Sequence, residues 1–253
     1  MSYGLLGCHI SYSKSPIIHQ KAMKEFKIEG DYQIYDVEKK NLECFLKEFI
    51  KKGGRGLNVT QPYKKIVAES IGCHLPSVNT LREKNGRWEG FSTDGEGLKR
   101  AMGRYLQPPI AYDSIVVIGG GAVFPVLQTL FNHAKIQLLM RNPVKKPGVF
   151  VHDLSCELLT EFLKSAQLVI QATSGPFFGH DLSYLLPALD EYQGELIDLT
   201  YGKTSSLYLS CKNKGLACMD GYPMLIEQAR VSQEIWWGQS SSYNSLYAEC
   251  QCM

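Results

Sequence analysis

The stretch SIVVIGGGA, residues 114–122, combines a short apolar run with three consecutive glycines. An unbroken apolar run predicts a strand buried on both faces of a parallel sheet, and glycines directly after such a strand are typical of dinucleotide-binding folds. A helical segment is predicted to follow at 122–131. Further strand-like runs alternate with stretches of helical patterning such as 156–165, and they lie at 136–140, 149–152, 168–172, 196–200 and 216–219. The second half is therefore predicted to be a Rossmann-type, doubly wound parallel sheet.

The first half of the chain has a different pattern. Strands are predicted at 3–8, 32–37 and 56–60, and helices at 16–26 and 42–50. The runs at 77–82 and 87–91 flank Asn85-Gly86, a dipeptide favoured in two-residue hairpin turns. The fold class is thus α/β with two domains, a mixed α/β domain followed by the Rossmann domain, and the boundary is expected near 94–98. A last helix at 224–237 is expected to pack back onto the first domain. Trp236-Trp237 at its end is expected to pack that helix rather than to stack on a ligand.

Composition and charge limit the classes of partner. The chain has 253 residues, a formal net charge of +2, and no low-complexity tract, so nothing attracts it broadly to nucleic acid or membrane. No signal peptide and no apolar run of roughly 20 residues is visible, which predicts a cytoplasmic protein without membrane association. Six of its eight cysteines are too scattered for a zinc site, and no metal is predicted. The close pair Cys250-Gln-Cys252 is expected to lie in a frayed tail, and the alternative for it is metal or redox chemistry.

The glycine turn predicts a dinucleotide site. Gly119-x-Gly121, between a strand and a helix, allows a sharp turn and close backbone approach to a pyrophosphate, although Phe124 stands where a small residue is usual. The next strand ends in Arg141-Asn142-Pro143, followed by Lys145 and Lys146, where NAD sites usually carry an acidic residue. Arg can bind a 2′-phosphate in a bidentate manner, which favours NADP over NAD; the alternative is a solvated basic loop.

Polar residues gather at predicted strand ends in the first half. Ser11 to Ser15 precede Pro16, a residue suited to the first turn of a helix, and Ser15 alone would be an ordinary helix N-cap. Three further polar segments lie at 58–64, 77–80 and 90–94. Each alone is compatible with turn chemistry, but together they favour a site for a polyhydroxylated acid.

These segments, in the same order over nearly the whole chain, resemble the motifs of the shikimate dehydrogenase family. The N-terminal signature resembles residues 7–19, with Ser13, Ser15 and Pro16 in place. The other matches are Asn-Val-Thr-x-Pro-x-Lys at 58–64, Val-Asn-Thr at 78–80, Thr-Asp-x-x-Gly at 93–97, Ala-Thr-Ser at 172–174, Asp-Leu-Thr-Tyr at 198–201 and Gly-x-x-Met-Leu-x-x-Gln-Ala at 221–229.

The resemblance implies a function and a set of site residues. It implies NADPH-dependent, reversible reduction of 3-dehydroshikimate to shikimate in aromatic amino acid biosynthesis, by a monomer or homodimer. Residues 1–94, with a C-terminal helix at about 229–253, would form the substrate-binding and catalytic domain, and 95–228 the NADP-binding domain. The catalytic pair would be Lys64 and Asp94. The substrate would contact Ser13, Ser15, Thr60, Asn79, Asp94, Tyr201 and Gln228, and the cofactor Gly119, Gly120, Gly121, Ala122, Arg141, Asn142, Thr173, Gly221 and Met224.

The chemistry requires such a pair. A protonated lysine beside a ketone can polarise it and donate the proton that must follow a hydride. In the reverse direction the lysine must be neutral, and since lysine ordinarily has a pKa of about 10.4, shikimate oxidation should accelerate toward alkaline pH. The alternatives are a surface charge for Lys64 and a helix N-cap for Asp94.

The chain departs from the family pattern in several places. His9 and Tyr12 replace Pro and His, Ser92 replaces the Asn before Thr-Asp, and Gln171 replaces the Asn before Ala-Thr-Ser. The glycine turn lacks the usual following Arg and reads Val-Phe-Pro at 123–125, and Arg-Asn-Pro at 141–143 replaces Asn-Arg-Thr. Two alternatives therefore stay open: a quinate/shikimate dehydrogenase paralogue that uses NAD, and a non-catalytic dinucleotide- or metabolite-sensing protein on the same fold.

Overall fold

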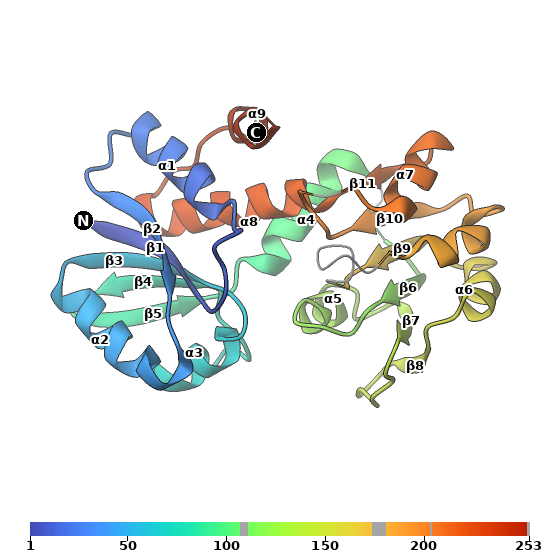
Figure 1. The fold of residues 1–253 in the computed structure, drawn as a ribbon, viewed down its shortest axis with the longest axis horizontal. Coiled ribbons are helices and arrows are strands. Elements are labelled where there is room, and N and C mark those ends of the chain that lie inside the picture. The colour runs from blue at the N-terminus through green and yellow to red at the C-terminus, as the bar shows by residue number, and fades with distance from the viewer. Residues whose placement is uncertain (107–110, 174–180, 203, 252–253) are drawn as a thin grey trace. The chain divides into compact units, whose positions relative to one another are not determined.

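The computed structural model describes residues 1–106, 111–173, 181–202 and 204–251 (Figure 1). The chain divides into two compact units, residues 1–97 with 225–253, and residues 98–224. The divisions fall inside two helices, α4 (Asp94–Tyr105) and α8 (Gly221–Trp237). No helix in the described ranges is both long and apolar enough to cross a bilayer.

The first unit contains a five-stranded mixed sheet in the order β2-β1-β3-β4-β5. The strands β1 (Ser2–Gly7), β2 (Asp31–Asp36) and β3 (Gly54–Val59) are parallel, whereas β4 (Thr80–Lys84) and β5 (Arg87–Phe91) are antiparallel. Asn85 and Gly86 join the last two strands with positive φ values of 53° and 76°, as the hairpin turn requires. The predicted strand at 77–82 was placed too early, because the strand begins at Thr80.

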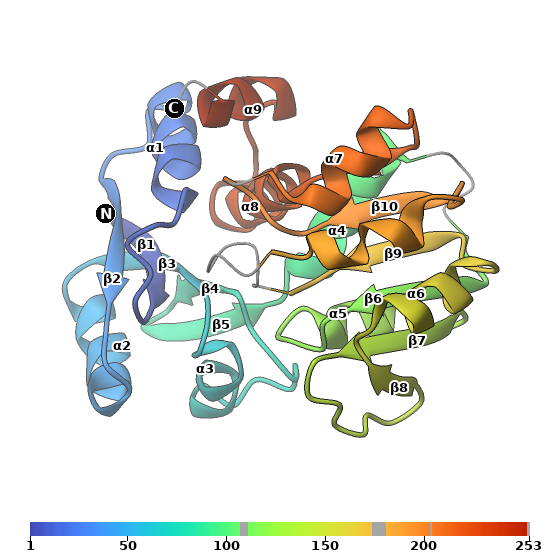
Figure 2. The ribbon, with the colours of Figure 1, turned by 45° about the vertical axis from the view of Figure 1, so that its right-hand side comes forward.

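Alternate residues of β1 face two different cores of this unit. Leu6 packs in the core formed with α2 (Leu42–Lys51) and α3 (Lys64–Ser70), while Tyr3 and Leu5 pack in the core formed with α1 (Ser15–Glu25). Period-two alternation thus buries both faces of the sheet. Figures 1 and 2 show α2 and α3 on one face of this sheet and α1 on the other.

The end of α8 packs against the same sheet. Trp236 donates a 2.8 Å hydrogen bond from Nε1 to the carbonyl oxygen of Leu81. The rings of Trp236 and Trp237 lie 5.3 and 5.4 Å from the ring of Tyr3. The expectation that these tryptophans pack the helix is therefore confirmed.

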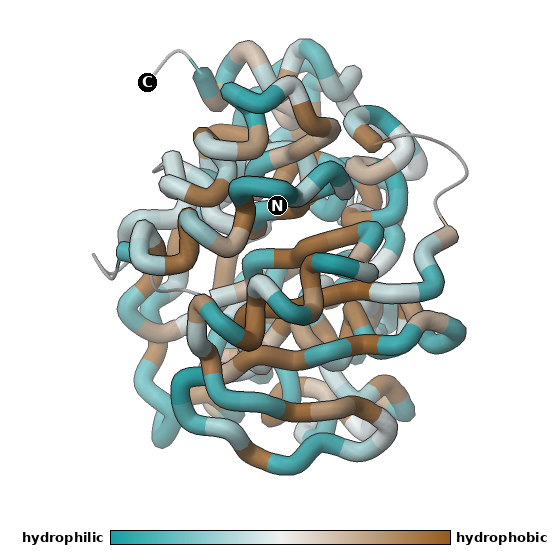
Figure 3. The backbone as a smooth tube through the Cα atoms, turned by 90° about the vertical axis from the view of Figure 1, so that its right-hand side faces the viewer, coloured by the Kyte–Doolittle hydropathy of each residue, from teal (hydrophilic) through white to brown (hydrophobic). Residues whose placement is uncertain are grey.

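The second unit contains a six-stranded sheet in the order β11-β10-β9-β6-β7-β8, and every pair of neighbours is parallel. Its strands are β6 (Ser114–Ile118), β7 (Lys135–Met140), β8 (Phe150–Asp153), β9 (Leu168–Gln171), β10 (Glu195–Asp198) and β11 (Cys218–Met219). Both faces are covered: Val117 packs in a core with α5 (Phe124–Leu130), and Val116 in a core with α6 (Cys156–Leu163) and α7 (Ser206–Asn213). The predicted α/β class and parallel sheet are confirmed. Figure 3 shows hydrophobic stretches, coloured brown, alternating with hydrophilic stretches along the backbone.

Several elements differ from the sequence predictions. The helices α3, α4 and α7 and the 3₁₀ segments η1 (Lys39–Asn41) and η3 (Ser183–Leu189) were not predicted. The C-terminal region contains two helices, because Gly238, at φ 69°, ends α8 before α9 (Tyr243–Gln251) begins. The frayed tail was a wrong prediction: Cys250 is buried within α9, while Cys252 lies outside the described residues.

Candidate active site

Lys64 and Asp94 form an ion pair in the first unit. Lys64 is the first residue of α3, just after the turn that follows β3, and Asp94 is the first residue of α4. The Lys64 ammonium donates to Oδ2 of Asp94 at 2.6 Å, and the two side chains are only 20% and 11% exposed. Neither side chain is a freely solvated surface charge, and the Asp94 carboxylate is engaged by side chains rather than only capping a helix.

Asn79 fixes the orientation of that carboxylate. Its Nδ2 donates to Oδ1 of Asp94 at 2.8 Å and to Oγ1 of Thr93 at 2.9 Å, and its Oδ1 accepts from the backbone N–H of Thr93 at 2.7 Å. Asn79 is 4% exposed, so its amide is held away from solvent. Thr93, which the sequence analysis named only within the Thr-Asp-x-x-Gly motif and not as a site residue, thus belongs to the site; its place in that motif was the available signal.

Gln228 reaches the same cluster from α8. Its Oε1 accepts from Oγ1 of Thr93 at 3.4 Å, and its Nε2 donates to the carbonyl oxygen of Leu225 at 3.0 Å. Gly97 makes this approach possible, because a Cβ atom on Gly97 would lie 2.6 Å from both the Cβ and the backbone N of Gln228. This close packing therefore explains why a glycine occupies the last position of the Thr-Asp-x-x-Gly segment.

Ser13, Ser15 and Thr60 lie in the same unit. Ser13 Oγ accepts from the backbone N–H of Ser15 at 3.2 Å, and their hydroxyl oxygens are also 3.2 Å apart. Ser15 is not the helix N-cap that its sequence position suggested: α1 begins at Ser15, and its N-cap is Lys14. Thr60 donates its backbone N–H to Leu6, and its Cγ2 would lie 2.8 Å from a Cβ on Gly7. Within the described residues, no hydrogen bond links these three side chains to Lys64 or Asp94.

A second, buried network of hydrogen bonds includes Thr80, the residue that follows Asn79. Tyr32 donates its hydroxyl to Oδ1 of Asn58 at 2.8 Å, and Nδ2 of Asn58 lies 3.0 Å from Oγ of Ser232 and 3.1 Å from Oγ1 of Thr80. Ser232 in turn donates to the backbone carbonyl of Gln228. Asn58 therefore ties β3 and β4 to the helix that carries Gln228.

The two histidines of the N-terminal signature lie outside these hydrogen bonds. His9 is exposed, with φ 56°, and its backbone N–H donates to Asp36. His19 is fully buried, and its ring stacks on Tyr32 at a centroid distance of 4.5 Å. Burial lowers the pKa of His19 to about 3, so the ring is neutral.

In the second unit, the glycine turn is open on one side. Gly119 has φ 99°, and a Cβ there would lie 2.6 Å from Cγ2 of Thr173, whereas a Cβ on Gly121 would meet nothing within 4 Å. Both Gly121 and Ala122 are exposed. Phe124, the bulky residue at the third fingerprint position, is accommodated because its ring is buried in the core beneath α5.

Gln171 joins the ends of β9 and β10. Its Oε1 accepts from the backbone N–H of Thr173, and its Nε2 donates to Oγ1 of Thr200 at 3.0 Å and lies 3.4 Å from Oδ1 of Asp198. Asp198 also accepts from the Ser205 hydroxyl, and burial raises its pKa above the ordinary value. Gln171 thus links the segment beside Gly119 to the next strand end; Ser174, the last residue of that motif, lies outside the described residues.

The remaining predicted residues also belong to the second unit. Arg141 and Asn142 are exposed after β7. Gly221 is packed tightly, since a Cβ there would lie 2.5 Å from the carbonyl oxygen of Leu199. Met224 packs against the core that contains Val117, and the ring of Tyr201 lies 5.9 Å from that of Tyr222.

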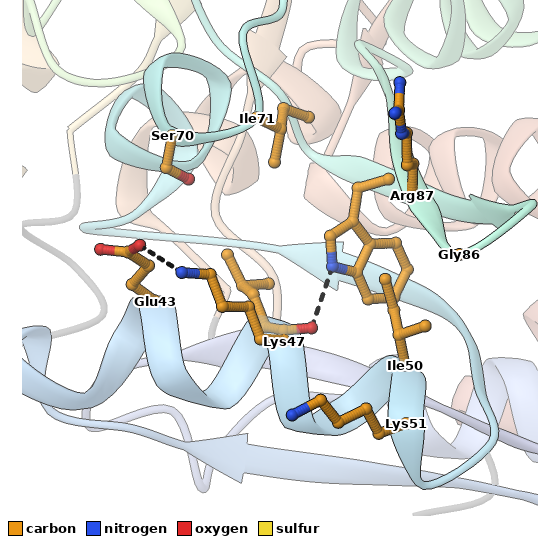
Figure 4. Close-up of a pocket in the computed structure, with 10 residues that line it drawn as sticks. Glu43, Lys47, Ile50, Lys51, Ser70, Ile71, Gly86 and Arg87 are labelled. Carbon is orange, nitrogen blue, oxygen red and sulfur yellow. Dashed lines mark hydrogen bonds and ion pairs between the residues drawn. The ribbon is translucent and has the colours of Figure 1, made fainter.

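A pocket of about 480 Å³ lies elsewhere in the first unit, between α2 and the turn joining β4 and β5 (Figure 4). Lys47 pairs with Glu43 at its rim, and Trp88 donates from Nε1 to the carbonyl oxygen of Leu46. None of the predicted site residues lines this pocket. Among the described residues, no three His, Cys, Asp or Glu side chains gather in a way that could hold a metal ion.

The chain is similar to known proteins over nearly its whole length. The family model for the shikimate dehydrogenase substrate binding domain matches residues 5–74. The shikimate dehydrogenase (NADP(+)) of Laribacter hongkongensis is 32% identical, over 93% of this chain and 92% of that protein, and the Bacillus subtilis protein of the same name is 29% identical over 96% and 94%. The shikimate 5-dehydrogenase of Thermus thermophilus, solved with NADP(H) and shikimate, has the same fold, with a TM-score of 0.85 at 23% identity, covering 100% of this chain and 99% of that one. The chain belongs to the shikimate dehydrogenase family.

Proposed function

We propose that this protein is an NADP-dependent shikimate dehydrogenase that interconverts 3-dehydroshikimate and shikimate, with Lys64 and Asp94 as the catalytic pair. The observation that carries the proposal is the 2.6 Å contact between the Lys64 ammonium and the Asp94 carboxylate, held by Asn79 on its other oxygen. The chain's relatives bear the name of this activity and of this cofactor.

The two side chains explain how a proton is transferred to and from the substrate oxygen. In reduction, the Lys64 ammonium hydrogen-bonds to the ketone oxygen and donates a proton to it as the carbonyl carbon gains a hydride. In oxidation, neutral Lys64 accepts the hydroxyl proton. Asp94 holds the lysine nitrogen in place, and its carboxylate is available to accept a hydrogen bond from a substrate hydroxyl.

The substrate would be held by the polar groups of the first unit, which we propose as the substrate-binding and catalytic domain. Ser13, Ser15 and Thr60 carry hydroxyls suited to a carboxylate, and the amides of Asn79 and Gln228 carry both donors and acceptors for ring hydroxyls. Tyr201, on the second unit, would add a phenolic hydroxyl.

The residues of the second unit fit a dinucleotide. When bound, NADPH supplies the hydride. The positive φ of Gly119 and the open space at Gly121 let a pyrophosphate approach the backbone, and the exposed Arg141 and Asn142 can bind a 2′-phosphate. Ala122, Thr173, Gly221 and Met224 complete the proposed contacts. A cytoplasmic location and a monomeric or homodimeric state remain predictions from the sequence.

The two alternatives are less well supported. A sensor of the same fold would not need a partly buried lysine–carboxylate pair, and the exposed Arg141 favours NADP over NAD. The test is to follow reduced-nicotinamide absorbance with shikimate or quinate, each with NADP or NAD. We expect turnover chiefly with shikimate and NADP. Equal turnover with quinate or NAD would indicate the broader paralogue, and binding of shikimate without any turnover would indicate the sensor.

A further inference from the structure

The pocket of about 480 Å³ in the first unit lies between three elements: α2, the C-terminal end of α3 and the turn that joins β4 to β5 (Figure 4). Its apolar wall is formed by Leu46 and Ile50 from α2, Ile71 at the end of α3, and Trp88 on β5. Ile71 and Trp88 pack against the core of this unit and yet are only partly buried. The pocket therefore leaves apolar surface exposed to solvent, and an apolar ligand that covered this surface would be bound favourably.

Two side chains of this wall are held in place. Trp88 donates from Nε1 to the carbonyl oxygen of Leu46 at 3.1 Å, so its N–H is satisfied within the protein and only the ring surface is offered to a ligand. The buried Phe49, which does not line the pocket, stacks on the same indole with ring centroids 6.1 Å apart. Ile71 rests on β5, because a Cβ atom on Gly90 would lie 2.8 Å from its Cδ1. A fixed indole favours a flat aromatic ligand, since aromatic rings attract one another beyond the area that they bury.

The charges around the pocket leave one cation unmatched. Lys47 pairs with Glu43 at 2.7 Å, and Lys51 pairs with Glu48 at 2.8 Å. Arg87, the first residue of β5, also lines the pocket and is exposed, and among the described residues its side chain makes no ion pair and no hydrogen bond. The pocket is therefore complementary to a ligand with one negative charge. A guanidinium can bind a carboxylate through two parallel hydrogen bonds.

We propose that this pocket binds a small aromatic monocarboxylate, with its ring against the indole of Trp88 and its carboxylate on Arg87. The apolar wall alone would accept any apolar molecule, whereas the unmatched guanidinium selects an anion. The pocket is large enough, because small-molecule sites typically have volumes of roughly 300–1,000 Å³. The inference does not depend on the proposed function, since none of the residues proposed for the reaction lines this pocket.

The test is isothermal titration calorimetry at low salt with the full-length protein. The acid is indole-3-acetate, its neutral analogue is indole-3-acetamide, and its cationic analogue is tryptamine. We expect the acid to bind with a Kd of about 0.1–1 mM, as the size of the ligand allows. The amide should bind roughly fivefold more weakly or worse, and tryptamine should not bind measurably. A repeat with saturating shikimate should give a Kd for the acid within about twofold of the first value, because the two sites are separate.

Three variants locate the ligand. Arg87→Ala should weaken binding of the acid roughly fivefold or more and leave binding of the amide unchanged. The control is Lys84→Ala, which removes an exposed charge of β4 that does not line the pocket, and it should bind the acid as wild type does. Ser70→Trp, at an exposed position of the rim, should fill the pocket and abolish binding of both ligands. Thermal unfolding checks that each variant is folded.

Three results would overturn the proposal. The first is the absence of measurable binding of indole-3-acetate to the wild-type protein at millimolar concentration. The second is an affinity for the acid that Arg87→Ala and Ser70→Trp leave unchanged, which would mean that the acid binds elsewhere. The third is displacement of the acid by shikimate, which would place it in the candidate active site instead.

Discussion

Asn79 donates a 2.8 Å hydrogen bond to Oδ1 of Asp94, so the carboxylate is held at one oxygen by an amide and at the other by the Lys64 ammonium. The amide is itself fixed, because its oxygen accepts the backbone N–H of Thr93, the residue next to Asp94. A carboxylate held at both oxygens cannot rotate, and the lysine nitrogen is positioned with it.

Replacing Asn79 should therefore impair catalysis. In Asn79→Ala the carboxylate loses its amide donor, and we expect kcat/KM for shikimate to fall roughly a hundredfold, the effect of a misplacement of about 1 Å. The control is Asn41→Ala, since Asn41 is exposed and its side chain does not cap α2. Equal kcat/KM values for the two variants would show that Asn79 does not position Asp94.

Two glycines of α4 should respond in opposite directions to the same substitution. A Cβ on Gly97 would lie 2.6 Å from the backbone N of Gln228, so Gly97→Ala should lower the free energy of unfolding by about 1–3 kcal/mol and raise the KM for shikimate. A Cβ on Gly103 would meet nothing within 4 Å, so Gly103→Ala should raise the free energy of unfolding by about 0.5–1 kcal/mol, because alanine favours the helix more than glycine does. Thermal and denaturant unfolding measure both; stabilisation by Gly97→Ala would contradict the close approach of α8.

His19 should make the protein sensitive to acid. Burial lowers its pKa to about 3 from an ordinary value of 6.5, so below pH 6.5 the unfolded chain takes up a proton that the folded chain does not. The free energy of unfolding therefore decreases as the pH falls below the ordinary pKa of histidine, and at pH 5 it is lower by about 2 kcal/mol. His19→Phe, which keeps an aromatic ring on Tyr32, should remove that part of the pH dependence, whereas the exposed His74→Gln should retain it. Denaturant unfolding between pH 7 and pH 5 tests this, and identical pH slopes for the two variants would argue against it.

Gln171 should matter for both stability and cofactor binding. In Gln171→Leu, the backbone N–H of Thr173 loses its acceptor and Thr200 loses a donor, which should cost about 1–3 kcal/mol. Because Thr173 packs against Gly119, the KM for NADP should rise while the KM for shikimate stays near wild type. An unchanged KM for NADP would show that Gln171 has only a structural role.

Much of the fold could be predicted because its signals are local. The apolar run at 114–118 and its glycine turn predicted β6 correctly, and Asn85-Gly86 predicted the hairpin. The helices that were missed give weak local signals: α3 has seven residues, and α4 contains three glycines, two of which are Gly97 and Gly103. Gly97 is explained only by its contact with Gln228, more than a hundred residues away, and no local pattern contains that contact.

The site was predicted less completely than the fold. Residue types and their resemblance to a family indicated Lys64, Asp94, Asn79 and Gln228, and the structure connects all four through hydrogen bonds that include Thr93. Ser15 looked like an N-cap, yet the helix begins one residue earlier than that role requires.

The central claim, that Lys64 transfers the proton, is tested most directly by comparing two adjacent lysines of α3. Lys64 is paired with Asp94 at 2.6 Å, while the Lys65 side chain is 78% exposed and lies 3.8 Å from Glu69. Single-turnover reduction of 3-dehydroshikimate at saturating substrate and NADPH would be measured for both alanine variants, with shikimate binding measured in parallel. We predict that Lys64→Ala lowers the rate roughly 10²- to 10⁴-fold while still binding shikimate, and that Lys65→Ala stays within about twofold of wild type. A near wild-type rate for Lys64→Ala would contradict the account.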